Sequence, residues 1–540
     1  MVGNSYLGIT SGLLVMRQES DNDGHSRRGW ESSRRIHPSD SQHRLDDEGL
    51  PPMNLHTRKS RRQFIMGALA TTGTLGLTPA FGQVGNRDIR QIDSDALKKL
   101  RAQLKGGLIL PTDSGYEAAR RVFFWNPETE RRPALVARCV HADDVRYAVE
   151  FARRHGLEVA VRGGGHSHMG WGTSNGLVID LTGMNRVTIN AAQHTGRIDA
   201  GVLGGEVMRV AGRYGLAPVL GECPGVGAAG VTLGGGLGWL SGLHGASCDN
   251  LLSARMVTAD GRILSVDAER NPDLLWALRG AGANFGVTTT LECRLHSASP
   301  ITSGEIYYPV REARPVLRFF RDLMAAAPDS FQAELNLTQG ERGVFVMLCH
   351  AGERAEAERL LRAFRTVATP AKDTVRRQEF AELAGISLTG GPDTNFRCVA
   401  TVYRNELSDE VMDIILDRLS QAPLETVLAI AHYMHGEVCR VKPDSTAFPL
   451  RQSGGIHIRI NSDWKDSADA QRLMLWADEA RRLLRPSSGE RIYANYQSHA
   501  GKGTPEAVFG SNYSRLVALK NKYDPTNFFR RNSNVEPRQA

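Results

Sequence analysis

The chain is poor in cysteine, and none of its cysteines stands in a metal-binding pattern. No two of them form a C-x-x-C pair, and no histidine–cysteine cluster has the spacing of a zinc site, so we expect no metal site. Most should be small buried hydrophobic residues. The seven in the 540-residue chain are Cys139, Cys223, Cys248, Cys293, Cys349, Cys398 and Cys439.

Long apolar runs and clustered positive charge are also missing. No stretch reaches the roughly 20 apolar residues needed to cross a bilayer, so we expect no stable membrane anchor. The formal net charge is +7, but the lysines and arginines are scattered and do not alternate with aromatic residues. Without a basic patch or a recognisable nucleic-acid module, a nucleic acid is not expected as a partner.

The N-terminal region carries a targeting signal. Residues 60–66, SRRQFIM, form a twin-arginine pattern, followed by a short apolar run over 67–77 and a small-x-small cleavage site at 80–82. We therefore predict a signal peptide over 53–82, transient contact with the twin-arginine export machinery, and a periplasmic or secreted protein. Residues 1–52 are polar and aperiodic, so they are either disordered or absent from a product whose translation begins at Met53.

The first half of the remaining chain alternates strands and helices without a dinucleotide-binding Rossmann unit. Apolar periodicity predicts strands over 135–140, 157–162, 177–181 and 197–200 and helices over 142–155 and 205–214. The Asp260-Gly261 pair between apolar runs predicts a hairpin over 256–266. The Gly280-Ala281-Gly282 stretch follows helical residues 274–279, not a strand, which disfavours nicotinamide binding.

The sequence changes in character near residue 300. Strands predicted over 344–349, 427–433 and 456–460 alternate with amphipathic helices over 354–365 and 467–485. This pattern favours a mainly antiparallel sheet with helices on one face. We predict an α+β chain in which residues 300–490 form a substrate-binding domain.

Two glycine-rich segments are the most informative feature. They are RGGGHSHMG, residues 162–170, and GECPGVGAAGVTLGGGLGW, residues 221–239. Glycines let the backbone approach a cofactor closely and offer N–H groups to phosphate. A histidine in such a turn can become a covalent flavin ligand, although a single histidine after glycines is more often a structural turn residue. WALRGAGANFGV, residues 276–287, follows in the same order and makes the pattern more specific.

The ordered segments resemble the berberine bridge enzyme-like FAD-linked oxidases of the vanillyl-alcohol oxidase/PCMH superfamily. The resemblance runs from about residue 91 to 537 and suggests a bacterial, exported member. It implies a PCMH-type FAD-binding domain over 91–299, interrupted by the substrate domain and completed by 491–540. The other segments that carry it are FFWNPETERRPALVARC (123–139), TAFPLR (446–451), YANY (493–496) and YDPTNFFRRNSNVEP (523–537).

The resemblance implies FAD as the cofactor and assigns residues to it. His166 matches the covalent 8α-histidyl ligand, Cys223 matches a second link at flavin C6, and a valine at Val226 resembles relatives that use O2. His168 has a weaker case. The further predicted FAD-binding residues are Arg162, Gly163, Gly164, Gly165, Ser167, Gly227, Gly230, Gly234, Gly235, Gly236, Gly286, Val287, Tyr493 and Asn495.

The second tyrosine of YANY, Tyr496, matches the family's catalytic tyrosine. Several relatives carry Glu, Gln or Asp approximately where Arg459 stands, and an arginine cannot accept a proton. Arg459 therefore either stabilises a phenolate or binds an anionic substrate. If Tyr496 is not the base, candidates are His457, His432 and Tyr433.

We expect a small-molecule alcohol or hemiacetal, from a carbohydrate or a secondary metabolite, to lose a hydride to the flavin, and O2 to reoxidise the flavin with release of H2O2. The alternatives are an oxidative cyclase or amine oxidase of secondary metabolism, and a non-catalytic flavin-binding protein.

Overall fold

The computed structural model describes residues 92–385, 395–487, 489–499 and 503–538. The predicted signal peptide, the twin-arginine motif and residues 1–52 lie outside these ranges. The described residues all belong to one compact unit. Within the described ranges, no helix combines the length and the apolar character needed to cross a membrane.

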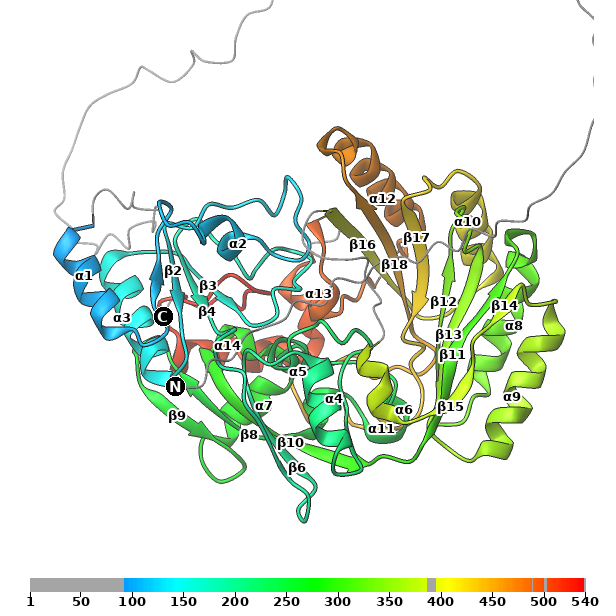
Figure 1. Cartoon of the computed structure of the whole chain (residues 1–540), viewed down its shortest axis with the longest axis horizontal. Helices are drawn as coiled ribbons and strands as arrows, with labels where there is room; N and C mark the ends of the chain where they lie inside the picture. Colours follow the sequence, from blue (N-terminus) through cyan, green and yellow to red (C-terminus); the bar gives the residue numbers. More distant parts are fainter. Residues whose placement is uncertain (1–91, 386–394, 488, 500–502, 539–540) are drawn as a thin grey trace, which may run out of the picture. The chain divides into compact units, whose positions relative to one another are not determined.

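The first sheet delivers the histidine-bearing turn. Its strand order is β1 (Leu108–Ile109), β2 (Leu135–Arg138), β4 (Leu177–Asp180) and β3 (Val159–Arg162), and β4 is parallel to both β2 and β3. Helix α3 (Ala142–His155) makes the crossover from β2 to β3, while α1 (Ser94–Gln103) and α2 (Tyr116–Arg120) lie nearby (Figure 1). Because β3 ends at Arg162, the next residues, 163–170, begin at the carboxyl edge of this sheet.

The second sheet is antiparallel and lies under the second glycine-rich segment. Its order is β5 (Val187–Asn190), β6 (Thr195–Asp199), β10 (Val287–Ser297), β8 (Leu251–Val257) and β9 (Ile263–Val266), and β7 (Leu216–Pro218) also pairs with β10. The predicted hairpin is confirmed: β8 pairs with β9, and Gly261 has a φ of 84°. The accompanying helices are α4 (Gly204–Gly212), α5 (Ala228–Leu233), α6 (Ser241–His244) and α7 (Pro272–Ala281).

A third, larger sheet is built from residues 301–464. Its order is β14 (Lys372–Asp373), β11 (Ile301–Tyr308), β13 (Val344–His350), β12 (Phe331–Leu337), β17 (Thr426–Ala431), β18 (Ile456–Trp464) and β16 (Phe396–Arg404), with β15 (Arg376–Gln378) against β11. Every one of these pairings is antiparallel. The prediction of an antiparallel sheet in an α+β chain is confirmed; its role in binding substrate stays a prediction.

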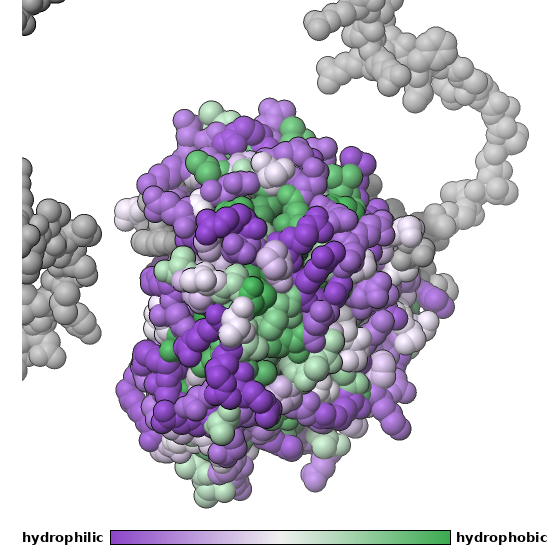
Figure 2. Space-filling model, turned by 90° about the vertical axis from the view of Figure 1, so that its right-hand side faces the viewer, coloured by the Kyte–Doolittle hydropathy of each residue, from purple (hydrophilic) through white to green (hydrophobic). Residues whose placement is uncertain are grey.

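Four helices cover one face of this third sheet. They are α8 (Ala313–Ala325), α9 (Arg354–Val367), α10 (Asp409–Ser420) and α12 (Ala470–Leu484), and their apolar side chains share one core with the strands. Seen from this side, the molecule is mostly hydrophilic, with apolar residues gathered near the centre of the view (Figure 2). The apolar sides of these helices therefore face the sheet.

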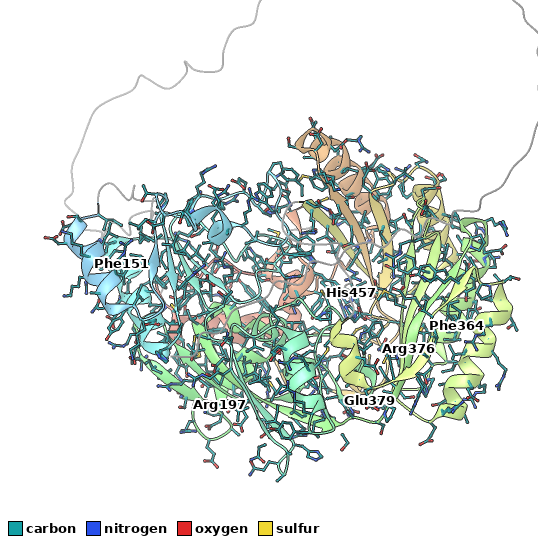
Figure 3. All side chains as sticks on the ribbon, in the orientation of Figure 1. Phe151, Arg197, Phe364, Arg376, Glu379 and His457 are labelled. Carbon is teal, nitrogen blue, oxygen red and sulfur yellow. The ribbon has the colours of Figure 1, made fainter. Side chains whose placement is uncertain are left out.

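The alternation of side chains along β18 places polar residues on the face of the sheet opposite the helices. Along β18, Ile456, Ile458 and Ile460 belong to the core beneath the helices. Because successive side chains on a strand point to opposite faces, His457 and Arg459 lie on the other face. Figure 3 labels His457 on this inner side and Phe364 of α9 on the outer side. Polar residues on the inner face thus become available to a site between the sheets.

The C-terminal segment returns to the first part of the chain. It contains α13 (Pro505–Phe509) and α14 (Tyr513–Tyr523), and the short α11 (Glu437–Arg440) precedes β18. The fully buried Lys520 donates hydrogen bonds to Asp524 Oδ2 at 2.7 Å and to the carbonyl oxygens of Asn284 and Phe529, each at 2.8 Å. This ammonium group fixes the segment that follows α14 beside the end of α7.

Candidate active site

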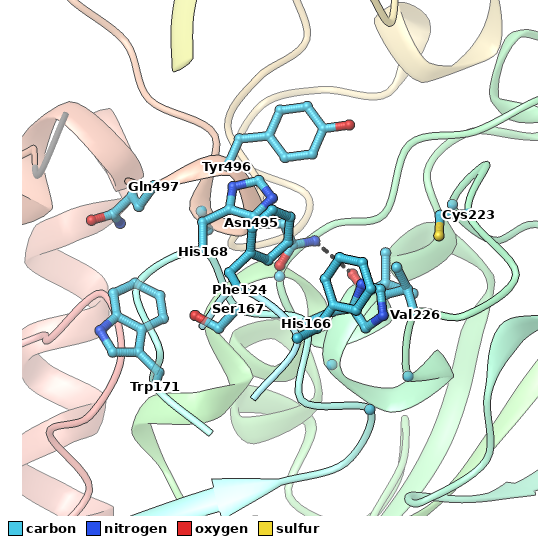
Figure 4. A pocket seen from close by; sticks show the side chains of 18 of the residues that line it. Phe124, His166, Ser167, His168, Trp171, Cys223, Val226, Asn495, Tyr496 and Gln497 are labelled. Atoms are coloured by element: carbon cyan, nitrogen blue, oxygen red, sulfur yellow. Dashed lines mark hydrogen bonds between the residues drawn. The ribbon is translucent and has the colours of Figure 1, made fainter. Parts of the chain in front are cut away.

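A single large cavity of about 650 Å³ brings the predicted site residues together. Its wall is made by both glycine-rich segments, the inner face of the third sheet and the short helical turn η7 (Ala494–Tyr496). His166, Cys223 and Tyr496 all line it, although they are far apart in sequence (Figure 4). The arrangement places a cofactor-type cradle opposite a polar, ionisable wall.

The two glycine-rich turns touch backbone to backbone. A Cβ on Gly164 would lie 2.3 Å from the Gly227 nitrogen, and a Cβ on Gly227 would lie 2.5 Å from the Gly164 nitrogen. Gly165 follows with a φ of 70°, a conformation that glycine adopts without strain. Side chains at these positions would force the turns apart. Glycine is therefore required here by the close approach of the turns themselves.

His166 and Cys223 converge on the same point. An atom placed as the Cβ of Gly225 would lie 3.5 Å from His166 Nε2 and 3.9 Å from Cys223 Sγ. The ring of His166 stacks on Phe123 with a centroid distance of 4.0 Å and an interplanar angle of 11°. Burial, helped by the charge of Arg397, lowers the pKa of His166 to about 4, which keeps its imidazole neutral at pH 7.

Opposing influences act on the thiol of Cys223. Backbone N–H groups at Gly225 and Val226 favour its thiolate, and so does the charge of Arg459. Burial nevertheless outweighs them and raises the pKa of the thiol above its ordinary value. All seven cysteines are free, and five are buried; Cys223 and Cys439 are half-buried, so the expectation that most are buried is confirmed.

Most of the predicted FAD-binding residues line the cavity. Those that do are Gly163, Gly164, Gly165, His166, Ser167, Cys223, Val226, Gly227, Gly230, Gly234, Gly286, Tyr493 and Asn495. Four others lie behind the wall. Arg162 pairs with Asp180 at 2.8 Å, Val287 is buried in β10, and Gly235 and Gly236 pack against Phe448 and Ser247. These four shape the turns and do not face the cavity.

The YANY segment is fixed to the second glycine-rich turn. Asn495 Nδ2 donates hydrogen bonds to the Val231 carbonyl and to Tyr493 Oη, each at 2.9 Å. Tyr493 Oη in turn accepts from the Gly236 nitrogen at 2.8 Å. Tyr493 and Asn495 thus hold the next residue, Tyr496, at the cavity wall.

Tyr496 is part of a closed ring of five ionisable side chains, here called the acid–base ring: Tyr496, His432, Glu222, Glu334 and Arg459. Tyr496 Oη lies 2.5 Å from His432 Nε2 and accepts from Arg459 Nη1 at 3.3 Å. His432 Nδ1 lies 3.3 Å from Glu222 Oε1. Arg459 Nη2 donates to Glu334 Oε2 at 2.5 Å, and the two glutamates are hydrogen-bonded to each other.

Burial and neighbouring charges set the protonation of this ring. Burial, reinforced by Glu222, raises the pKa of Glu334 to about 7 against the opposing charge of Arg459. For Glu222, burial is outweighed by its interactions with His432, a hydrogen bond among them, and by the charge of Arg459, which together lower its pKa. Burial and both glutamates raise the pKa of Tyr496 well above its ordinary value. Arg459 acts in the direction expected from the sequence but does not by itself make Tyr496 a phenolate.

Sequence analysis missed two members of the ring. Glu222 directly precedes Cys223 and is the only carboxylate in the second glycine-rich segment, which is a signal that could have found it. Glu334 lies on β12, far away in sequence, and no local pattern marks it.

His168 lies beside the ring, because its imidazole stacks on Tyr496 with centroids 5.6 Å apart. Burial, Arg459 and His166 lower the pKa of His168 to about 3.

The cradle fits FAD chemically. Gly230 lines the cavity, and a Cβ placed there would meet no atom within 4 Å, so the space in front of it is open. Apart from Glu222, the acidic lining residues belong to the third sheet and its loops: Glu305, Glu334, Glu425 and Asp463. Apart from Glu222, the glycine side thus offers backbone N–H groups and no carboxylate to a pyrophosphate. In the described part of the chain, no group of three or more metal-ligating side chains is poised to hold a metal.

Comparisons with known proteins identify the family of this chain. The model of the FAD binding domain matches residues 133–267, and the berberine and berberine-like model matches residues 492–536. The (R)-6-hydroxynicotine oxidase of Paenarthrobacter nicotinovorans is 30% identical over 456 residues, which cover 80% of this chain and 97% of that protein. An FAD-linked oxidoreductase of Aspergillus terreus is 28% identical over 488 residues, covering 80% and 94%.

Solved structures show the same fold. The crystal structure of 6-hydroxy-D-nicotine oxidase from Arthrobacter nicotinovorans has a TM-score of 0.74 and 29% identity, covering 81% of this chain and 98% of that one. Berberine bridge enzyme from Eschscholzia californica has a TM-score of 0.74 at 21% identity, covering 83% of this chain and 100% of that one. At this low identity, the similarity supports the fold and not the activity. The chain therefore belongs to the berberine bridge enzyme-like family of FAD-dependent oxidoreductases.

Proposed function

We propose that this protein is an oxidase that removes a hydride and a proton from an alcohol or hemiacetal carbon of a carbohydrate or secondary metabolite. The observation that carries the proposal is Tyr496, whose hydroxyl lines the cavity and is hydrogen-bonded to both His432 and Arg459. A buried tyrosine linked to further acid–base groups can remove the hydroxyl proton of a bound alcohol.

FAD, when bound, supplies the two-electron acceptor, and O2 then regenerates it with release of H2O2. The chain's own residues hold the cofactor and position the substrate. His166 and Cys223, which approach one common point, are proposed as the two covalent attachments. Val226 also lines the cavity, and we propose, from the resemblance to oxidases, that it lets O2 reach the flavin.

The inner face of the third sheet is proposed to bind the substrate. Asn336, Asn461 and Asp463 line the cavity there, and the Asn336 amide nitrogen and one Asp463 oxygen are buried without a hydrogen-bond partner. Buried polar atoms of this kind are normally satisfied, so they suit a ligand rich in hydroxyl groups. Arg459 already pairs with Glu334, which favours its action on Tyr496 over capture of an anionic substrate.

Oxidation of an amine is the second candidate. It is favoured by the 30% identity to a protein named (R)-6-hydroxynicotine oxidase, which covers most of both chains. Loss of a hydride from a carbon beside nitrogen would use the same cavity, with less need of a proton acceptor at Tyr496. Oxidative cyclisation would share that first step. Membership of an enzymatic family disfavours a non-catalytic flavin carrier.

The protein is also proposed to act in the periplasm or outside the cell, after export by the twin-arginine machinery. Support comes from the motif at residues 60–66. Replacing Arg61 and Arg62 together by lysine should retain the protein in the cytoplasm, as cell fractionation would show. Unchanged export of that variant would contradict the proposal.

The function is tested by peroxide release from a panel of probes: glucose, cellobiose, benzyl alcohol and (R)-6-hydroxynicotine. We expect a sugar or alcohol to reduce the flavin and release H2O2, and Tyr496→Phe to slow anaerobic flavin reduction by ~10²-fold or more while retaining FAD. Faster reduction by the amine, with Tyr496→Phe near wild type, would establish the second candidate. Reduction without peroxide would indicate a dehydrogenase.

A further inference from the structure

The acid–base ring contains more ionisable groups than are needed to orient the hydroxyl of Tyr496. Burial raises the pKa of Tyr496 well above its ordinary value, so an isolated phenolate would be costly in this site. Tyr496 Oη can therefore accept a proton from the substrate only if it gives up its own phenolic proton at the same time. The group placed to take that phenolic proton is the imidazole of His432.

We propose that His432, held by Glu222, receives the proton that leaves the substrate and passes through Tyr496, so that Tyr496 acts as a neutral shuttle. This proposal rests on the proposed function. It assigns proton acceptance to His432 and makes Glu222 a positioning residue that also stabilises the imidazolium ion. The resemblance that identified Tyr496 and Arg459 assigned neither role.

The hydrogen-bond geometry gives His432 the required tautomer. Glu222 is an acceptor when ionised, so the nitrogen beside it, His432 Nδ1, carries the hydrogen. His432 Nε2 is then a lone-pair acceptor, and it lies 2.5 Å from Tyr496 Oη. Tyr496 donates to this nitrogen and simultaneously accepts from Arg459 Nη1. A hydroxyl arranged in this way can pass its proton on while it receives another.

The backbone at His432 is strained in a way that points to function. Strand β17 ends at Ala431, and His432 has a φ of 49°, in the left-handed region that non-glycine residues seldom adopt. Continuation of the strand would have placed this side chain by simple alternation. The left-handed residue instead sets its ring 5.4 Å from the ring of Tyr496, centroid to centroid. Such strain is retained where the surrounding structure requires a particular side-chain position.

The proposed step balances without an additional reactant. The substrate C–H bond breaks and its hydride leaves with two electrons to bound FAD, while the hydroxyl O–H bond breaks and its proton bonds to Tyr496 Oη. The phenolic proton moves to His432 Nε2, and the substrate carbon–oxygen bond becomes a carbonyl. The imidazolium that results lies beside the ionised Glu222, which compensates its charge.

Other ionisable groups face His432, but none is as well placed to receive this proton. His457 packs edge-to-face on His432, and burial, His432 and Arg459 lower its pKa far below the ordinary value. Neither ring nitrogen of His457 has a hydrogen-bond partner among the described residues. Glu334 bonds to Arg459 and Glu222 and is itself held partly protonated. His168 stacks on Tyr496, and its pKa is lowered to about 3.

The test is anaerobic stopped-flow flavin reduction as a function of pH, with the fastest-reacting probe of the panel and the FAD-loaded enzyme. In the wild type the rate should rise with pH, because the relay requires a free lone pair on His432 Nε2. This rise is here called the ascending limb of the pH profile. His432→Gln, which keeps a hydrogen-bond acceptor but no base, should lose this limb, and flavin reduction should be ~10²-fold slower. Glu222→Gln removes the compensating charge, so the limb should move to lower pH and the maximal rate should fall.

His457→Gln is the matched comparison, because it is the same substitution at a neighbouring buried histidine that packs edge-to-face on the Tyr496 ring but makes no hydrogen bond to its hydroxyl. It should keep the limb and the rate. The double variant Tyr496→Phe/His432→Gln should be no slower than the slower single variant, because the two residues serve one step. A readout independent of turnover is the ¹⁵N NMR spectrum of the histidines, in which the signal lost in His432→Gln should belong to an Nδ1–H tautomer.

The outcomes separate the proposal from the function beneath it. If Tyr496→Phe is slow but His432→Gln keeps the limb and a rate within ~3-fold of wild type, the relay is wrong and the proposed function stands. If Tyr496→Phe reduces its flavin at the wild-type rate, the proposed function itself fails. An Nε2–H tautomer at His432 would also overturn the relay. If His432→Gln does not fold, the Glu222→Gln variant decides: an ascending limb at the same pH as in wild type would refute the relay.

Discussion

The contact between the two glycine-rich turns leads to a prediction with an internal control. Alanine at position 164 would place its Cβ 2.3 Å from the Gly227 nitrogen and 2.7 Å from the Gly227 Cα, both backbone atoms. Ordinary contacts between heavy atoms are about 3.5–4.0 Å, so the turns would have to separate by more than about 1 Å. Overpacking of this kind typically costs about 1–3 kcal/mol. Gly164→Ala should therefore melt several degrees lower than wild type and carry less FAD.

Gly230→Ala is the control, because its Cβ would meet no protein atom and would project into open space of the cavity. Gly230 lies within α5, where alanine favours the helix by up to about 1 kcal/mol. The cofactor-free variant should thus melt no lower than cofactor-free wild type, while its FAD occupancy falls. The assay is thermal unfolding together with the ratio of flavin to protein absorbance. Wild-type stability and FAD content in Gly164→Ala would refute the reasoning.

Two further predictions concern the acid–base ring. The pKa of Glu334 is raised to about 7 in the folded protein against about 4.3 unfolded, so its contribution to stability is present below pH 4.3 and lost as pH rises to 7. The side chain of Glu334→Gln cannot ionise, so the free energy of unfolding of this variant should rise relative to that of wild type by on the order of 3 kcal/mol between pH 4.5 and 7.5. Denaturant unfolding at these two pH values measures the difference. The same pH dependence of stability in both proteins would contradict this prediction. Arg459→Gln removes a positive charge from beside Tyr496, so the pH dependence of flavin reduction should move upward, whereas a change confined to KM would assign Arg459 to substrate binding.

Local signals in the sequence predicted individual elements well. Helix α3 spans the predicted residues 142–155, because Asp144 accepts from the Val140 nitrogen at its start and the left-handed Gly156 ends it. Helix α12 begins three residues later than predicted, at Ala470, after a short turn capped by Asp466. Strand β17 ends at Ala431, two residues early, since His432 leaves the extended conformation.

Contacts between distant segments could not be predicted in the same way. The parallel pairing of β4 with β2 and β3 depends on the crossover and has no local signature. The acid–base ring joins Glu222, Glu334, His432, Arg459 and Tyr496 from five separate segments. Family resemblance supplied Tyr496 and marked the departure at Arg459, but the partners became visible only through strand alternation and the strained residue after β17.

The central claim is that this cavity holds FAD attached to His166 and Cys223, and its most direct test is mass spectrometry after acid denaturation. We predict that the flavin stays with the polypeptide and that trypsin releases peptides 163–186 and 214–255 cross-linked through one FAD. In Cys223→Ala the flavin should remain on peptide 163–186 alone. Release of all FAD into the acid supernatant, with both peptides unmodified, would contradict the account.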